Sequence, residues 1–385
     1  MNDVDKVLVV GGGIGGLSAA IAFASHGREV ELLEKRPDFN VPGVGLGQPA
    51  CALRVYRRLG VLEEILDTGF SYNHMSTFDP DRVLIVEHRF LMGGMGLPAF
   101  CALPRAVLHD ILRRRAQALG VRFRMGAEVS TFGGEHGTSI RFSDGAQAEY
   151  DLVAGFDGIR STARRYIVGD MFGPRHCGIG AWRVQVDRPD CVTGMEFMQG
   201  VRGKAGAIPI TRDKMYLFNI RPEDPSEFFA ADAMHLLMKE RLAQFGSYVK
   251  EIADSLTPES PIVYGALEPF IVPYPWHRGR VVMGGDAAHV VPPHLTAGAA
   301  MAVEDAYVLA RCVTSGEGSI QDRLHAYGET RFARNAFVYT FACEWMDIEQ
   351  SVRSQAELAA AKAEYARNLD GRISAADRIL DAFTC

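Results

Sequence analysis

The chain contains 385 residues, 48% of them hydrophobic and 23% charged, and more than one lobe is expected because a single core stops growing near about 250–300 residues. A formal net charge of −6 gives no electrostatic reason to bind nucleic acid or an anionic membrane, and no apolar run reaches the roughly 18 residues of a membrane-spanning helix. Seven scattered cysteines without a C-x-x-C spacing indicate reduced thiols and no metal site. The N-terminus is unlike a secretory signal, so a cytoplasmic protein is expected.

Residues 6–35 predict a complete βαβ unit. The apolar run Val7 to Val10 predicts a buried strand, the helix that follows is expected to stop at Gly27, and a second strand is expected to end at Glu34. Between the first strand and the helix lies a Gly-x-Gly-x-x-Gly motif, formed by Gly11, Gly13 and Gly16.

Each glycine of this motif has a separate task. Gly11 allows a tight turn, Gly13 lets a pyrophosphate approach the backbone, and Gly16 lets helix and strand pack closely. The N–H groups and the dipole at the helix start favour phosphate charge, and the Glu34 carboxylate can accept hydrogen bonds from ribose hydroxyls. The motif predicts dinucleotide binding but does not separate FAD from NAD.

Further along the first lobe, residues 49–68 show helical periodicity, and residues 101–120 predict an amphipathic helix with Pro104 near its first turn. Arg105 stands at the start of that helix, where its side chain either reaches back toward the ligand or is simply solvated. Several strands then lead to an apolar strand at Asp151 to Gly155.

The pattern changes between residues 175 and 275, where short strands predict an antiparallel sheet covered by one helix at 232–253. Residues 278–313 return to the first style, with a buried strand, a Gly-Asp corner and a long helix. Beyond residue 320 the segments are helical without a catalytic pattern, and the Ala- and Glu-rich residues 354–369 predict a partly exposed tail helix or a subunit contact.

Three motifs stand in order along the chain: the glycine corner with Glu34, GFDGIRSTARR at 155–165, and GGDAAHVVPP at 284–293. Together they resemble the FAD-dependent aromatic-ring hydroxylases, which are single-component flavin monooxygenases of the para-hydroxybenzoate hydroxylase type. The likeness covers roughly residues 5–340. Within the family, the chain most resembles members that act on aromatic acids, hydroxypyridines and urate. No second Gly-x-Gly-x-x-Gly motif follows a strand, in agreement with that family.

The resemblance implies an α/β fold, with a Rossmann-like FAD-binding domain built on a parallel sheet and a smaller α+β substrate domain with an antiparallel sheet. We expect the FAD-binding domain at 1–72 with 100–174 and 278–345, the substrate domain at 73–99 with 175–277, and a C-terminal helical segment at 346–385.

The family also implies roles for the two later motifs. Asp157 and Gly158 would lie near the FAD pyrophosphate and help to handle the nicotinamide cofactor, although a plain strand-end turn is the alternative. Asp286 would accept from the FAD ribitol, and Pro292 would lie beside the flavin ring. His289 is interpreted as a packed corner histidine. The full set of predicted cofactor-binding residues is Gly11, Gly13, Ile14, Gly15, Gly16, Glu34, Lys35, Gly47, Arg105, Val129, Asp157, Gly158, Asp286, Pro292, Gly298 and Ala299.

One departure from the family concerns the segment after the prolines. Thr296 and Ala297 stand where the family carries Gly and Gln, whereas Gly298 remains. The helix start still aims the N–H groups of Gly298 and Ala299 at the flavin edge that gathers negative charge. We therefore expect this departure to affect how the flavin ring is positioned and not whether FAD binds.

The implied reaction uses NADH or NADPH as a transient co-substrate and O2, and it hydroxylates an electron-rich aromatic or N-heteroaromatic small molecule through a flavin C4a-hydroperoxide. The substrate-binding residues predicted are Arg183, Lys204, Tyr216 and Pro293, and the catalytic residues predicted are Tyr216 and His294. Lys204 and Tyr216 resemble substrate-contacting positions of the urate-hydroxylating branch, where an arginine takes the place of Lys204.

Two other functions stay open from the sequence. One is an FAD-dependent reductase or epoxidase of isoprenoids, and the other is a non-catalytic FAD-binding scaffold or redox sensor. The expected partners are the small aromatic substrate, NAD(P)H and O2, with no nucleic acid or membrane, and a homodimer is one option.

Overall fold

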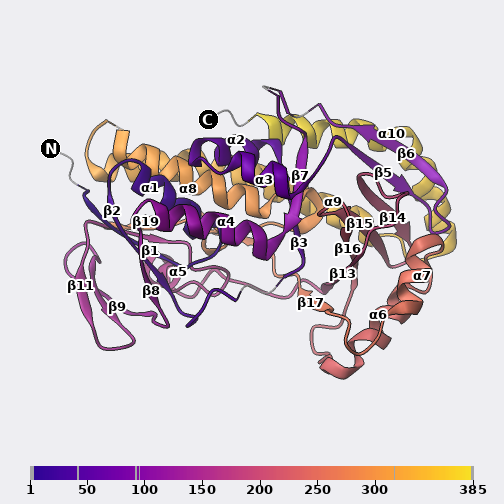
Figure 1. Ribbon diagram of the computed structural model, residues 1–385, viewed down its shortest axis with the longest axis horizontal. Helices are drawn as coiled ribbons and strands as arrows, with labels where there is room; N and C mark the ends of the chain where they lie inside the picture. Colours follow the sequence, from indigo (N-terminus) through magenta and orange to yellow (C-terminus); the bar gives the residue numbers. More distant parts are fainter. Residues whose placement is uncertain (1–3, 41–42, 92, 95, 316, 383–385) are drawn as a thin grey trace.

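The computed structural model describes residues 4–40, 43–91, 93–94, 96–315 and 317–382, so the parts of the expected domains at 1–3, 41–42, 92, 95, 316 and 383–385 lie outside the described residues. Figure 1 shows an elongated molecule with two lobes. The first lobe is built on a six-stranded sheet and the second on a seven-stranded sheet, and two long C-terminal helices lie across both.

The six-stranded sheet has the strand order β19-β20-β12-β1-β2-β8. Its strands are β1 (Lys6–Val10), β2 (Glu29–Glu34), β8 (Arg122–Met125), β12 (Leu152–Gly155), β19 (His277–Arg278) and β20 (Val281–Met283). All neighbours pair in parallel except β19 with β20. This arrangement confirms the predicted parallel sheet, and it places the carboxyl ends of β20, β12 and β1 side by side.

Both faces of this sheet are covered, which explains why β1 is apolar throughout. Val7 and Val9 pack into one core cluster, whereas Leu8 and Val10 pack into another on the opposite face. The first face is covered by α1 (Ile14–Ser25), α4 (Arg105–Ala118) and α8 (Gly298–Ser315). The second is covered by a small sheet of β9 (Val129–Gly133), β10 (Ser139–Phe142) and β11 (Gln147–Glu149).

The remaining elements of the first lobe are short. They are α2 (Ala50–Leu59), α3 (Leu62–Thr68), α5 (Thr162–Val168), the sheet of β3 (Gly45–Pro49), β7 (Phe100–Pro104) and β4 (Phe70–Tyr72), and the pair β18 (Phe270–Ile271) and β21 (His289–Val290). The prediction of a helix from residue 101 was wrong in its first turn, because residues 101–104 belong to β7 and the helix begins at Arg105. Strand β7 lies between β3 and β4, so tertiary pairing overrides the helical pattern there.

The second lobe has the strand order β17-β13-β16-β15-β14-β5-β6. Its strands are β5 (His74–Phe78), β6 (Leu84–Arg89), β13 (Ile179–Asp187), β14 (Met195–Gly200), β15 (Gly203–Pro209), β16 (Lys214–Pro222) and β17 (Val263–Ala266). The predicted antiparallel pairing is confirmed for β13 to β17, while β14 pairs in parallel with β5. The domain boundaries given above stay predictions.

The second lobe has two cover helices where one was predicted. They are α6 (Met234–Leu242) and α7 (Ser247–Ser255). The chain is extended at Gly246, which caps α7, and Phe245 inserts into the core of this lobe, so the helical pattern is interrupted between the two segments.

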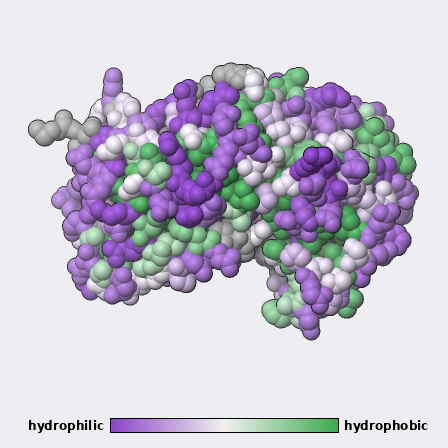
Figure 2. Space-filling model, in the orientation of Figure 1, coloured by the Kyte–Doolittle hydropathy of each residue, from purple (hydrophilic) through white to green (hydrophobic). Residues whose placement is uncertain are grey.

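The last two helices, α9 (Ile320–Gln350) and α10 (Gln355–Asp381), join the lobes (Figure 1). Helix α10 packs against β6 and α2, and Arg54 bonds Asp381 at 2.8 Å. The tail helix therefore packs within the chain, whereas a subunit contact remains a prediction. On the face drawn in Figure 2, hydrophobic patches lie among hydrophilic residues. Within the described chain, no helix combines the length and apolar character needed to cross a bilayer.

Candidate active site

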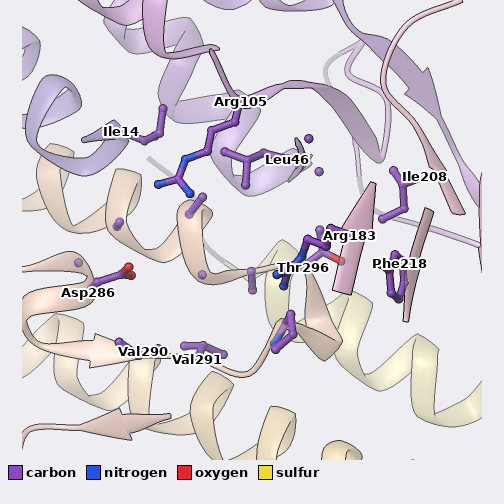
Figure 3. Close-up of a pocket in the computed structure, with 18 of the residues that line it drawn as sticks. Ile14, Leu46, Arg105, Arg183, Ile208, Phe218, Asp286, Val290, Val291 and Thr296 are labelled. Carbon is purple, nitrogen blue, oxygen red and sulfur yellow. The ribbon is translucent and has the colours of Figure 1, made fainter. Parts of the chain in front are cut away.

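The three predicted motifs lie at the adjacent carboxyl ends of β1, β12 and β20. In parallel sheets this edge is where ligands bind. A cavity of about 420 Å³ begins here and extends to the seven-stranded sheet of the second lobe. In Figure 3 the labelled side chains run from Ile14 and Asp286 at one end to Ile208 and Phe218 at the other.

The glycine corner after β1 has the properties that its spacing predicts. Gly11 adopts a φ of +105°, which an L side chain rarely takes. A Cβ on Gly16 would overlap the carbonyl oxygen of Gly11, so the start of α1 packs directly on the turn. A Cβ on Gly13 would meet nothing within 4 Å, because Gly13 faces the cavity together with Ile14 and Gly15.

Glu34 lies beside this corner at the end of β2. Its carboxylate accepts the backbone N–H of Gly12 at 2.8 Å and that of Arg36 at 2.9 Å, and it remains half-buried. The next residue, Lys35, is exposed. Val129 packs in the core between the six-stranded sheet and β9–β11 and does not line the cavity.

The corner after β12 is organised by Asp157. Its carboxylate accepts the N–H groups of Thr162 and Ala163 at 2.6 and 3.1 Å and also the hydroxyls of Ser161 and Thr162. Asp157 thus fixes the start of α5, and the neighbouring Gly158 lines the cavity. The arginines of this motif bond protein groups: Arg160 pairs with Glu268, and the guanidinium of Arg164 donates to backbone carbonyls.

The corner after β20 presents a second carboxylate, that of Asp286, to the cavity. Asp305 of α8 holds this corner, because it accepts the N–H of Gly285 at 2.8 Å and contacts His289 Nε2 at 2.6 Å. His289 is fully enclosed, which confirms its interpretation as a packed corner histidine. Pro293, Gly298 and Ala299 line the cavity, whereas Pro292 is buried behind it.

The departure at Thr296 has a structural counterpart. Thr296 adopts a φ of +54°, which is costly for a β-branched residue. A Cβ on Gly47 would come 2.6 Å from Thr296 Cγ2, so the absence of a side chain at Gly47 makes room for the threonine methyl. Gly47 and Thr296 form one wall of the cavity together.

Two opposite charges face the middle of the cavity. Arg105 from α4 and Asp286 extend into it from different walls (Figure 3). Both side chains are exposed to the cavity, and within the described residues neither makes a side-chain hydrogen bond or ion pair. Desolvation by surrounding protein lowers the pKa of Arg105 and raises the pKa of Asp286, and their mutual attraction opposes both shifts.

The second lobe contributes one face of its large sheet. Arg183, Lys204, Ile208, Tyr216 and Phe218 all line the cavity from β13, β15 and β16. Burial raises the pKa of the Tyr216 hydroxyl well above its usual value, against the influence of Arg183, so Tyr216 is protonated at neutral pH. Burial likewise lowers the pKa of Arg183, although a guanidinium stays charged.

Glu349 of α9 is a residue that sequence reasoning missed. Lys204 Nζ lies 2.7 Å from its carboxylate, and His294 Nε2 lies 3.1 Å from it. His294 was expected to be catalytic, but it is buried behind the cavity wall and does not line the main cavity. No motif marks Glu349, which is separated from Lys204 by 145 positions and meets it only through the fold.

The described residues fit a flavin dinucleotide. The open side of Gly13 leaves room for a pyrophosphate at the start of α1, and Asp286 offers an unpaired carboxylate to polyol hydroxyls. The first N–H groups of α8, at Gly298 and Ala299, have no partner within their helix. This donor set suits the phosphates, the ribityl chain and the electron-rich ring edge of FAD.

These features define a dinucleotide-binding protein of the flavin type with a substrate lobe over the ring end of the cavity. The family model described as "FAD binding domain" matches residues 5–342, and the chain belongs to that family.

Relatives with known names agree with this placement. YetM of Bacillus subtilis (strain 168), whose name marks it as a candidate FAD-dependent monooxygenase, is 34% identical over 342 residues that cover 88% of this chain and 92% of the relative. The 2-heptyl-3-hydroxy-4(1H)-quinolone synthase of Pseudomonas aeruginosa (strain UCBPP-PA14) is 31% identical over 315 residues, covering 79% of this chain and 80% of the relative.

A solved structure shows the same fold. HpxO of Klebsiella pneumoniae, crystallised with FAD and uric acid, has a TM-score of 0.86 at 22% identity and covers 98% of this chain and 97% of its own. The family match and these relatives together identify this chain as an FAD-dependent monooxygenase.

Proposed function

We propose that this enzyme hydroxylates an electron-rich aromatic or N-heteroaromatic small molecule, with NADH or NADPH as the electron source and O2 as the oxygen source. The observation that carries the proposal is the cavity that runs without interruption from the glycine corner to the polar face of the second lobe. Two relatives support the substrate class, since one is named as the synthase of a hydroxyquinolone and the other was crystallised with uric acid.

The first lobe would hold the cofactor. Glu34 would accept from the ribose hydroxyls, the N–H groups at Gly13 to Gly15 would bind the pyrophosphate, and Asp286 would bind the ribityl chain. FAD, when bound there, supplies the redox chemistry that places one oxygen atom of O2 on the ring and releases the other as water. Lys35, Val129 and Pro292 remain predicted contacts around it.

The second lobe would hold the substrate ring. Arg183 would bind an oxygen that carries negative charge, and the protonated Tyr216 would donate a hydrogen bond to a second polar atom. The apolar side chains of Ile208 and Phe218 would cover the ring and exclude water, which limits loss of the activated oxygen as hydrogen peroxide. The expected partners are therefore the small aromatic substrate, NAD(P)H and O2.

The direct test is turnover by purified FAD-loaded protein with a panel of hydroxylated aromatic and N-heteroaromatic compounds. NAD(P)H consumption, peroxide release and product mass are measured in ¹⁸O2. A substrate-stimulated consumption with one ¹⁸O atom in the product is expected. Bound FAD without stimulation by any ring would favour a scaffold or sensor, and activity on isoprenoids alone would favour the reductase or epoxidase alternative.

A further inference from the structure

Two cations line the cavity from the second lobe, and they stand on different strands. Arg183 is opposite Phe218, and Lys204 is opposite Ile220. Phe218 and Ile220 share one face of β16, which lies between β13 and β15. Because neighbouring strands are about 4.8 Å apart and two residues along a strand span about 6.6 Å, the Cα atoms of Arg183 and Lys204 are roughly 12 Å apart.

The charge of Lys204 is already balanced. Its Nζ atom lies 2.7 Å from Glu349 Oε2, and both side chains are less than one-tenth exposed. Burial alone would raise the pKa of Glu349, but Lys204 and His294 lower it to about 2, so the carboxylate is ionised at neutral pH. Burial lowers the pKa of His294, so its imidazole adds no charge, and the Lys204–Glu349 pair is neutral overall.

Arg183 is in the opposite situation. Its guanidinium is half-buried and faces the cavity, and no carboxylate in the described parts of the chain lies within ion-pair distance of it. The titratable groups that influence its pKa are the hydroxyl of Tyr216, which is uncharged at neutral pH, and the guanidinium of Arg105. An anion bound at Arg183 would therefore offset a desolvation cost that the protein leaves uncompensated.

The wall near Lys204 is otherwise apolar. The Lys204 ammonium lies 4.6 Å from the centre of the Phe197 ring. Phe197 and Thr296 also border a side recess of about 40 Å³, which is lined mainly by apolar groups such as Met75, Phe90 and Phe100. Its two titratable side chains, His294 and Asp377, are both buried, and the Asp377 carboxylate would repel a second anion. A recess of this kind suits the first carbons of an alkyl group and disfavours a second carboxylate.

We propose that Glu349 is a specificity-determining residue that neutralises Lys204 and so selects aromatic substrates with one anionic group. That group is held by Arg183, and the far side of the ring carries an uncharged alkyl substituent directed toward Phe197 and the side recess. This inference rests on the proposed function and adds the charge pattern of its substrate.

The test measures ligand binding to the FAD-loaded enzyme through changes in flavin absorbance, without reductant. The probes are 2-hydroxybenzoate with either a propyl group or a second carboxylate para to the first carboxylate, and the primary amide of the propyl compound. The wild type should bind the propyl compound at least about tenfold more tightly than the dicarboxylate. In Glu349→Gln this preference should fall by at least about tenfold, because the Lys204 charge is released.

Two further variants distinguish an effect of charge from a structural disruption caused by the substitution. The double variant Lys204→Met/Glu349→Gln should keep the preference for the propyl compound, since both charges are removed. Arg183→Met should weaken both carboxylates by at least about tenfold but not the amide. If Glu349→Gln is too unstable to purify, the wild-type preference for the propyl compound still tests whether Lys204 is neutralised, and the Arg183→Met comparison tests where the anion binds.

Each other outcome overturns the inference. These are an unchanged preference in folded Glu349→Gln, an equal loss of amide and carboxylate binding in Arg183→Met, or no binding of the propyl compound to the wild type. Turnover is scored separately. A wild type that hydroxylates other rings while these results fail loses only the Glu349 assignment, whereas no ring-stimulated turnover contradicts the proposed function itself.

Discussion

Gly13 and Gly16 stand three positions apart in the same turn, yet they meet different demands. A Cβ on Gly16 would overlap the Gly11 carbonyl, whereas a Cβ on Gly13 would enter open space where the cofactor is expected. Replacing Gly16 should therefore impair folding, whereas replacing Gly13 should impair cofactor binding.

We expect Gly13→Ala to leave the unfolding free energy of the FAD-free protein within about 0.5 kcal/mol of the wild type and to weaken FAD binding by at least about tenfold. Gly16→Ala should destabilise the FAD-free protein by at least about 2 kcal/mol, because backbone must shift. Urea unfolding and FAD titration measure the two effects. Equal stability losses in the two variants would contradict this division of roles.

The Glu349 carboxylate also predicts a pH dependence of stability. Its folded pKa is about 2, below the ordinary value of 4.5, so its contribution is present above that ordinary value and is lost as the pH falls toward 2. Between about pH 5.5 and 3.5, the wild type should lose stability more steeply than Lys204→Met/Glu349→Gln, by up to about 1.4 kcal/mol per pH unit. Parallel urea unfolding curves for both proteins across this range would be the contrary result.

The residue roles differ in how far the sequence could reveal them. The glycine spacing, Glu34 and Asp286 follow from local chemistry at strand ends, and the structure brings all three corners to one edge of the sheet. Glu349 carries no local signal, because its partner Lys204 lies on a strand of the other lobe. The same limit applies to His294, whose burial behind the wall depends on how α9 packs.

At the scale of elements, α9 is the part that ties the lobes together. Near its middle, Arg331 bonds Glu304 at 2.7 Å and Asp305 at 2.6 Å, and these carboxylates belong to α8 of the first lobe. Near its end, Glu349 bonds Lys204 of the second lobe. One rigid helix thus connects the corner that presents Asp286 to the wall that faces the substrate.

We expect Arg331→Met to destabilise the protein by about 3–5 kcal/mol, because the fully buried Asp305 loses the guanidinium that is paired with it, whereas Glu304 keeps its pair with Arg334. The matched control is Arg372→Met on α10, where an exposed pair with Glu364 is lost and less than about 1 kcal/mol is expected. Thermal and urea unfolding of both variants measure the difference. Similar costs in the two variants would show that the buried network is not what holds α9.

Element prediction succeeded where a pattern is local and failed where packing decides. The βαβ unit and the antiparallel strands follow from periodicity and glycine punctuation, and the structure confirms them. Residues 101–104 have a helical pattern but pair between β3 and β4, and the single helix expected at 232–253 is divided before Gly246. Pairing and core insertion are tertiary effects, which a local pattern does not contain.

At the scale of the whole molecule, the two lobes are arranged so that one cavity reaches from the phosphate-binding corner to the polar face of the second sheet. Neither lobe encloses this space alone, since Asp286 and Arg105 come from one and Arg183 and Tyr216 from the other. Joining cofactor and substrate in one enclosed space is what a monooxygenase needs to keep water from the reacting atoms.

A crystal structure with FAD and a hydroxybenzoate tests this arrangement most directly. We expect the dinucleotide to run from Glu34 past Gly13 and Asp286, with its ring at the start of α8 and the substrate carboxylate at Arg183. FAD bound outside this path, or a substrate whose ring lies away from the Arg183 and Tyr216 face, would contradict the account.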